Sequence, residues 1–117
     1  MVKPSVYNLS IYIGCDFSLA FQLLQEDEVT PINLTGTTIK SQIRLREDVT
    51  STLLASFVVT VPAPTDGTFY LSLTDTITSA ITAAFGFYDV LLTGPSSIDE
   101  IYIKGKVDFF KKVTSKT

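Results

Sequence analysis

Residues 16 to 25 alternate between apolar and small or polar side chains, and this alternation constrains the fold more than any other feature. The apolar members of the alternation are Phe17, Leu19, Phe21 and Leu23. Successive side chains of a β-strand point to opposite faces of a sheet, so the pattern predicts a strand with one buried face.

A second strand is predicted from Thr37 to Arg46. One face carries Ile39, Ser41, Ile43 and Leu45, and the other carries Lys40, Gln42, Arg44 and Arg46. The polar and basic face is expected to point to solvent.

The remaining β-rich runs are separated by turn signals. Thr and Ser supply 27 of the 117 residues, and the branched Cβ of Thr suits a pleated strand better than a helix. Asp66-Gly67 is typical of a hairpin, and Pro62 and Pro64 should end the strand before it. Further strands are therefore expected at 6–13, 53–61, 68–73, 87–93 and 101–109.

One short helix interrupts this pattern. Between Thr74 and Ala84, apolar residues fall at helical spacing, after a Thr74-Asp75 capping candidate and before Gly86 as a stop signal. A helix this short is not stable alone, so we expect it to close one end of the sheets while crossing between them.

These elements predict an all-β protein, a two-layer antiparallel β-sandwich of the Ig-like type. It should have about seven strands and one short cross-over helix near 75–84. A chain of 117 residues fits one compact domain. We place this domain at 1–110 and a basic C-terminal tail at 111–117.

The charge distribution indicates which kinds of partner the chain could bind. The net charge is −3, which disfavours nucleic-acid binding because several phosphates must be neutralised to gain affinity. From Lys104 to Thr117 there are five Lys and one Asp. This segment is expected to be a solvated tail, or alternatively a basic arm that meets an acidic neighbour. Neither a signal peptide nor a membrane span is predicted, so a soluble protein is expected.

Catalytic chemistry is not predicted. The chain contains no His, which removes the commonest general base and metal ligand, and Cys15 is expected to be a buried thiol. The acidic clusters at 26–28, 47–48 and 99–100 fall at predicted loop tips, where solvated turns are expected. We therefore predict no enzymatic activity, no metal and no cofactor.

The candidate contact residues are exposed aromatic and basic side chains. Tyr12, Tyr70 and Tyr102 are expected to point outward, because their neighbours on each side would take the core face. The strand 37–46 offers Lys40 and Arg44 on its solvent face. The candidates for partner contact, apart from Tyr70, are Tyr12, Lys40, Arg44, Tyr102, Lys111 and Lys112.

Asp89 is unusual because it follows Tyr88 inside an apolar strand. An unpaired charge there would be costly, so we expect an edge position or a hydrogen bond that ties the helix connection.

A series of strand starts and turns resembles a known family. The series consists of Asp16–Leu19, Pro31–Arg44, Gly67–Thr74, Gly86–Val90 and Lys104–Asp108. In this order the segments resemble the small β-sandwich modules of tailed-phage virion proteins. These include the N-terminal domain of upper baseplate proteins, which mount receptor-binding proteins or fibres.

The resemblance implies a non-enzymatic module that anchors or bridges other virion proteins, such as tail, baseplate or fibre subunits. Several copies are expected in a symmetric assembly, located in the virion after assembly in the host cytoplasm. No receptor-binding or shaft domain follows the module in this sequence, so an adaptor or decorating role is expected. The alternative is a free-standing carbohydrate- or receptor-binding β-sandwich, because a fold alone does not decide function.

Overall fold

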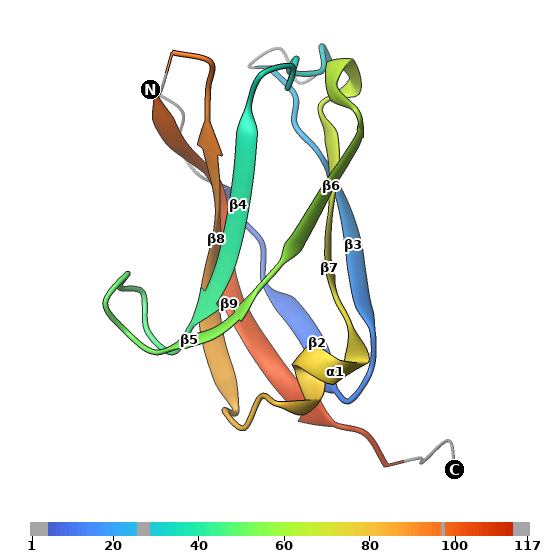
Figure 1. Cartoon of the computed structure of the whole chain (residues 1–117), viewed down its shortest axis with the longest axis vertical. Helices are drawn as coiled ribbons and strands as arrows, with labels where there is room; N and C mark the ends of the chain where they lie inside the picture. Colours follow the sequence, from blue (N-terminus) through green and yellow to red (C-terminus); the bar gives the residue numbers. More distant parts are fainter. Residues whose placement is uncertain (1–4, 26–28, 97, 114–117) are drawn as a thin grey trace.

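A computed structural model describes residues 5–25, 29–96 and 98–113 and shows an all-β chain (Figure 1). Its larger sheet has six strands. They are β1 (Ser5–Val6), β2 (Leu9–Ile13), β4 (Thr38–Arg44), β5 (Leu53–Ser56), β8 (Phe85–Thr93) and β9 (Asp99–Lys111). Both β1 and β2 pair with β9, after which the order is β8, β4 and β5.

The smaller sheet has three strands in the order β3, β7 and β6. Their bounds are β3 (Phe17–Gln22), β6 (Val58–Ala63) and β7 (Thr68–Leu73). The chain changes sheets at Phe57, between β5 and β6, and the predicted hairpin joins β6 to β7 through a 3₁₀ turn, Pro64–Asp66. Gly67 follows this turn with a φ of 67°, which favours glycine. Pro62 does not end β6 as expected, because an edge strand tolerates proline.

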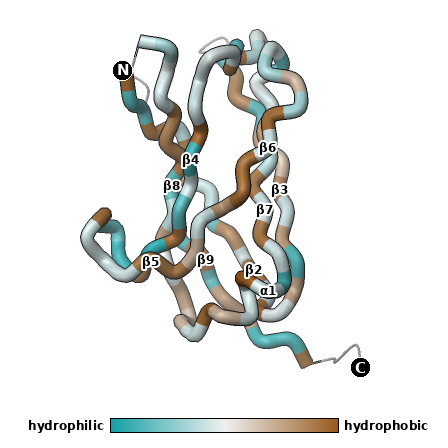
Figure 2. The backbone as a smooth tube through the Cα atoms, in the orientation of Figure 1, coloured by the Kyte–Doolittle hydropathy of each residue, from teal (hydrophilic) through white to brown (hydrophobic). Residues whose placement is uncertain are grey.

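The core lies between the two sheets. Alternation places Ile39, Ser41 and Ile43 of β4 on the buried face and leaves Lys40 and Gln42 exposed, as predicted. Figure 2 shows the corresponding change between hydrophilic and hydrophobic colour along this strand. From the smaller sheet, Phe69, Leu71 and Leu73 contribute to the same buried cluster. Burial of apolar surface between the layers therefore holds the two sheets together.

Strand pairing departs from the prediction in one respect. Among the strand pairs of the described residues, β1 and β2 run parallel to β9, whereas the other five pairs are antiparallel. The expected strand 6–13 is also divided in two at Tyr7 and Asn8. A fully antiparallel arrangement of about seven strands is therefore wrong in this detail.

A close backbone approach explains the division of the first strand. Tyr7 N–H donates to the Lys104 carbonyl at 2.8 Å, and Lys106 N–H donates to Asn8 Oδ1 at 3.0 Å. The buried Tyr88 hydroxyl donates to the Tyr7 carbonyl at 2.6 Å. A Cβ on Gly105 would clash with that carbonyl oxygen, so glycine is required for the two segments to lie this close together.

The predicted helix is present but shorter. Helix α1 spans Asp75–Ser79 and crosses from β7 in one sheet to β8 in the other. Thr74 caps it, because its side chain accepts a hydrogen bond from Ile77 N–H. Gly86 does not stop the helix as expected. It lies within β8, where a Cβ would come within 3.0 Å of Ile43, Arg44 and Leu54.

The last strand extends one residue into the expected C-terminal tail. Strand β9 extends to Lys111, so the first residue of the predicted 111–117 tail belongs to the sheet. Lys111, Lys112 and Val113 are exposed, and the tail beyond them lies outside the described residues.

Substituting Gly105 with Ala tests the close approach at Tyr7. The added methyl would displace the Tyr7 carbonyl and weaken the pairing of β1 and β2 with β9. We expect a loss of at least about 2 kcal/mol in the free energy of unfolding, measured by urea denaturation. Gly94→Ala is the matched control, because the nearest atom to its Cβ would be 3.9 Å away. Equal stability of the two variants would contradict this account.

Candidate interaction face

The outer face of the six-stranded sheet carries an exposed row of aromatic rings. We call it the aromatic stripe, and it consists of Tyr12, Phe85, Phe87 and Phe110. Tyr12 is 53% exposed, Phe110 45% and Phe85 42%, and Phe87 is half-buried. Exposed apolar groups are normal when scattered singly, but a contiguous set indicates an interaction site.

Ring contacts join the four rings in two pairs, and the strand register places the pairs side by side on one face. Tyr12 and Phe110 have ring centroids 5.6 Å apart on paired positions of β2 and β9. Phe85 and Phe87 meet edge to face at 6.1 Å on β8. Phe85 is paired with Asp108, so Phe110 lies two residues along the same face, at a diagonal position that aromatic side chains can bridge.

Charged side chains border the stripe. The Lys106 ammonium lies 5.0 Å from the centre of the Phe85 ring and 3.6 Å from Asp108 Oδ1. A cation over an aromatic face is attracted by the electron-rich ring. An apolar centre with a charged margin is the usual composition of a protein-binding surface.

Sequence reasoning found Tyr12 but missed the three Phe residues. Phe109 and Phe110 are adjacent, so in a strand they cannot both point into the core; Phe109 is buried and Phe110 is exposed. The same alternation buries Gly86 and Tyr88 and leaves Phe85 and Phe87 facing outward. The side of the strand to which each residue points, outward or toward the core, was the signal that could have identified the stripe.

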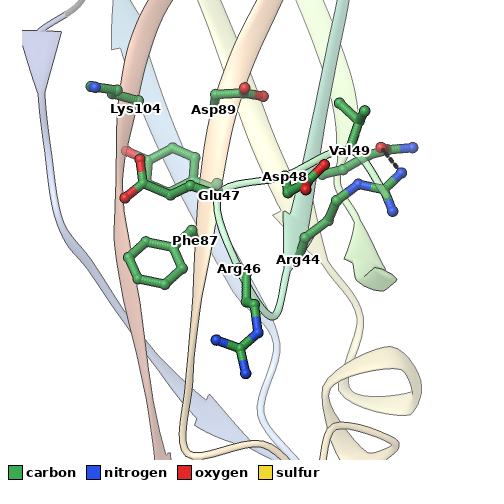
Figure 3. Close-up of a pocket in the computed structure, with 10 residues that line it drawn as sticks. Arg44, Arg46, Glu47, Asp48, Val49, Phe87, Asp89 and Lys104 are labelled. Carbon is green, nitrogen blue, oxygen red and sulfur yellow. Dashed lines mark hydrogen bonds between the residues drawn. The ribbon is translucent and has the colours of Figure 1, made fainter. Parts of the chain in front are cut away.

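A hollow lies beside the stripe on the same face, between the β4–β5 loop and strands β8 and β9 (Figure 3). Phe87 lines one side of it. The charged residues around the hollow are Arg44, Arg46, Glu47, Asp48, Asp89 and Lys104. Acidic and basic groups are interleaved in equal numbers, so the hollow matches a partner of mixed charge better than a simple anion or cation.

The loop that borders the hollow is held by internal hydrogen bonds. Asp48 Oδ1 accepts a hydrogen bond from Thr50 N–H at 2.9 Å, and this bond lowers the pKa of Asp48. Ser51 Oγ donates to the carbonyl of Asp48 at 2.8 Å and accepts from Arg46 N–H at 3.3 Å. These bonds give the rim of the hollow a defined shape.

Asp89 occupies neither of the positions expected for it. It lies on central strand β8, paired with Gln42 on one side and Lys104 on the other, and its side chain faces the hollow. Neighbouring side chains exclude water from part of its carboxyl, which raises its pKa above 3.8, while Arg44 lowers it by a smaller amount. Placement on the outer face reduces the cost of the charge, because its carboxyl keeps contact with water.

Two of the predicted basic contacts also lie on this face. Lys40 is exposed on β4. Arg44 is half-buried, and its guanidinium donates to the Ser51 carbonyl at 2.9 Å and to Gln42 Oε1 at 3.0 Å. Arg44 therefore supports the loop as well as lining the hollow.

The other predicted contact residues lie elsewhere. Tyr102 packs partly against the core, beside a register shift in the β8–β9 pairing, and therefore does not project freely. Burial, followed by the nearby Glu100, raises the pKa of Tyr102. Lys111 and Lys112 are exposed at the end of β9, where Lys112 Nζ donates to the Gly14 carbonyl at 3.4 Å. Tyr70 lies on the smaller sheet and is 38% exposed.

Two features do not occur in the described residues, 5–25, 29–96 and 98–113. These residues contain no group of three or more Cys, Asp or Glu side chains placed to hold a metal ion. They also contain no helix with the length and apolar character needed to cross a membrane. Cys15 is a free thiol and is only half-buried, whereas a buried thiol was expected.

Comparison of the chain with models of known protein families found no match, and comparison with curated proteins also found none.

Replacing Asp89 with Asn tests the electrostatics of the hollow. At a pH below 3.8 the carboxyl is protonated in both the folded and the unfolded chain, so the two proteins should be equally stable. Because folding raises the pKa, the wild type loses stability as the pH rises from 3.8 through the folded pKa. We expect Asp89→Asn to be slightly more stable at pH 7 and equal at pH 3, by urea denaturation. A gain of the same size at both pH values would contradict the proposed cause.

Proposed function

We propose that the protein is a non-enzymatic structural module of a tailed-phage particle, an adaptor of the tail or baseplate that docks to neighbouring subunits or mounts fibres. Its fold would be an Ig-like β-sandwich, and it would occupy the virion in several symmetric copies after assembly in the host cytoplasm. The observation that carries the docking role is the aromatic stripe on the outer face of the larger sheet.

The stripe has the chemistry of a protein-docking surface. Aromatic side chains lose few rotatable bonds on binding and bury a large area, so they often contribute most of the affinity of an interface. Tyr12, Phe85 and Phe110 are supplied by three adjacent strands, which hold the rings in fixed relative positions. A rigid apolar surface of this kind suits a permanent assembly.

The adjoining hollow would determine orientation. Its interleaved charges would favour one arrangement of a partner and disfavour others, since like charges in contact are costly. Lys40 and Arg44 lie on the same face as the stripe. This agrees with a surface whose rings would supply affinity and whose charges would determine orientation. The assignment to a phage particle is supported by the resemblance of the strand starts and turns described above.

Carbohydrate binding is the second candidate, and the same stripe favours it. Exposed aromatic rings can stack on the apolar faces of sugars, and the charged border could hydrogen-bond to hydroxyl groups. Against this, the rings lie on an open face rather than in a concave site of the kind that usually encloses a small ligand. Receptor recognition would therefore require a long, flat glycan.

The double substitution Phe85→Ser and Phe110→Ser tests the docking role. A tagged chain would be expressed in the host during phage growth, and its incorporation into purified particles would be measured. Loss of two anchor rings should reduce incorporation at least about tenfold, because single anchors often contribute about 2 kcal/mol. The variant should keep its unfolding midpoint close to that of the wild type.

Val58→Ser is the matched control for this experiment. Val58 is 52% exposed but lies on the outer face of the smaller sheet. Its substitution should leave incorporation unchanged. Absence of the wild-type chain from purified particles would overturn the structural proposal, and equal losses in both variants would remove the stripe from it.

A glycan array distinguishes the second candidate. The docking proposal predicts no binding by the wild-type chain to cell-wall or capsule polysaccharides. Binding that the Phe85→Ser and Phe110→Ser substitutions abolish, together with absence from particles, would favour the carbohydrate-binding function instead.

A further inference from the structure

We propose that strand β3 pairs edge to edge with β3 of a second copy of this chain, antiparallel and with the two-fold axis at Ala20. This pairing would join the two smaller sheets into one continuous sheet. The inference goes beyond the proposed function, since it concerns a different surface and a different partner from the aromatic stripe.

The edge at β3 lacks the features that usually protect sheet edges. An unpaired strand edge presents free backbone donors and acceptors, and proteins commonly block it with charge, proline, a bulge or short length. Strand β3 has six residues, Phe17–Gln22, with no charge and no proline. Its pairing with β7 continues without a register shift.

The other edges of the two sheets carry such protection. Strand β6 contains Pro62 and a register shift, and β5 has only four residues beside another shift. The edge formed by β1 and β2 is divided at Tyr7 and Asn8, and helix α1 packs against β2. In the part of the chain that the structure describes, β3 is therefore the edge best suited to accept another strand.

The hydrogen-bonding direction of β3 identifies the residues that face the open edge. Leu23 N–H donates to the Gly67 carbonyl at 2.8 Å, which continues the pairing of β3 with β7. In an antiparallel ladder alternate residues bond to the same neighbour, so the odd-numbered residues face β7. Ser18, Ala20 and Gln22 then direct their backbone N–H and C=O groups away from β7.

An antiparallel second copy satisfies all three of these residues in a single register. Ser18 and Gln22 are placed symmetrically about Ala20, so a two-fold axis at Ala20 opposes Ala20 to itself and Ser18 to Gln22. All three outward-directed residues are then paired. The arrangement is isologous, as closed dimers require, and it opposes no like charges.

The alternation of side chains along β3 also favours a second copy of β3 as the added strand. An added strand must place apolar residues toward the core side and small or polar residues on the outer face. Strand β3 has this alternation, with Phe17, Leu19 and Phe21 half-buried and the intervening residues exposed. In the proposed register, Leu19 lies opposite Phe21 of the second copy, so each would cover apolar surface that the isolated chain leaves partly exposed.

The outer surface next to the edge is compatible with close approach. Ala20 is paired with Tyr70, which is paired in turn with Thr60, and these residues carry no charge. The small Ala20 side chain leaves room on the outer face at the proposed axis. The area of a six-residue edge is below the roughly 800 Å² per partner of a stable interface, so dimerisation should depend on concentration.

Disulfide trapping tests both the partner and the register. The substitutions would be made in a Cys15→Ser background, and the purified full chain would be treated with a mild oxidant at several concentrations. Ala20→Cys should form a covalent dimer, because the two residues lie directly opposite each other at the axis. Ser18→Cys is the matched control on the same strand and face, and it should form at least about fivefold less dimer, since it lies opposite Gln22.

A charge substitution gives a second measurement without a new thiol. Ala20→Lys should shift the sedimentation-equilibrium profile of the otherwise unmodified chain to monomer, because two ammonium groups would meet at the axis. Thr60→Lys places the same charge on the same outer face at the far edge of the sheet, and it should leave self-association unchanged. Both positions are exposed, so both variants should remain folded.

Equal dimer yields from Ala20→Cys and Ser18→Cys, or a wild-type chain that stays monomeric at millimolar concentration, would overturn the proposal. Cross-linking of Ala20→Cys to a different subunit in purified particles would also overturn it and would assign the edge to a heterologous strand. The proposed function fails separately: a trapped dimer that is absent from particles contradicts the virion role alone.

Discussion

The pairing of β9 with strands on both of its sides is the constraint on which the larger sheet depends. Strand β8 joins it in antiparallel orientation, and β1 and β2 join it in parallel on the other side. Gly105 allows the backbone at Tyr7 to approach, and the Tyr88 hydroxyl satisfies the Tyr7 carbonyl there. The first and last strands are thus fixed to each other. Tyr12 and Phe110 are paired positions of β2 and β9, so the pairing of these two strands also fixes the positions of two of the four rings in the aromatic stripe.

The aromatic stripe and the core both result from the alternation of side chains along the strands, with one set pointing outward and the other pointing inward. In β8, Tyr88, Val90 and Leu92 point inward, and this phase requires Phe85 and Phe87 to point outward. Two aromatic rings that could have filled a core therefore remain at the surface. Their exposure is a consequence of strand phase in a well-packed sheet, and a shift of one residue would bury Asp89 and expose Tyr88. The core packing thereby protects the geometry of the proposed docking face.

Local patterns in the sequence predicted much of the fold, because the relevant physics is local. Alternation in β3 and β4, the Asp66-Gly67 turn and the Thr74 cap each depend on residues within one turn or strand. The parallel pairing of β1 and β2 with β9 joins the two ends of the described chain, and no local pattern encodes it. The stripe was missed for the same reason, since it combines residues from three strands. Tyr102 shows a further limit, because a register shift beside it turned an expected outward ring toward the core.

The two candidate surfaces require different energetic properties from the sheets that carry them. The aromatic stripe uses side chains of β2, β8 and β9, and the pairing of these strands with one another fixes the backbone beneath the rings, so binding requires little ordering. The β3 edge instead uses backbone groups, and these can pair only because the smaller sheet ends there. A face gives affinity through a few rings, whereas an edge gives register through regularly spaced hydrogen bonds. The two proposed contacts, with a different protein through the stripe and with a second copy through the β3 edge, use separate surfaces, and neither contact requires the core to change.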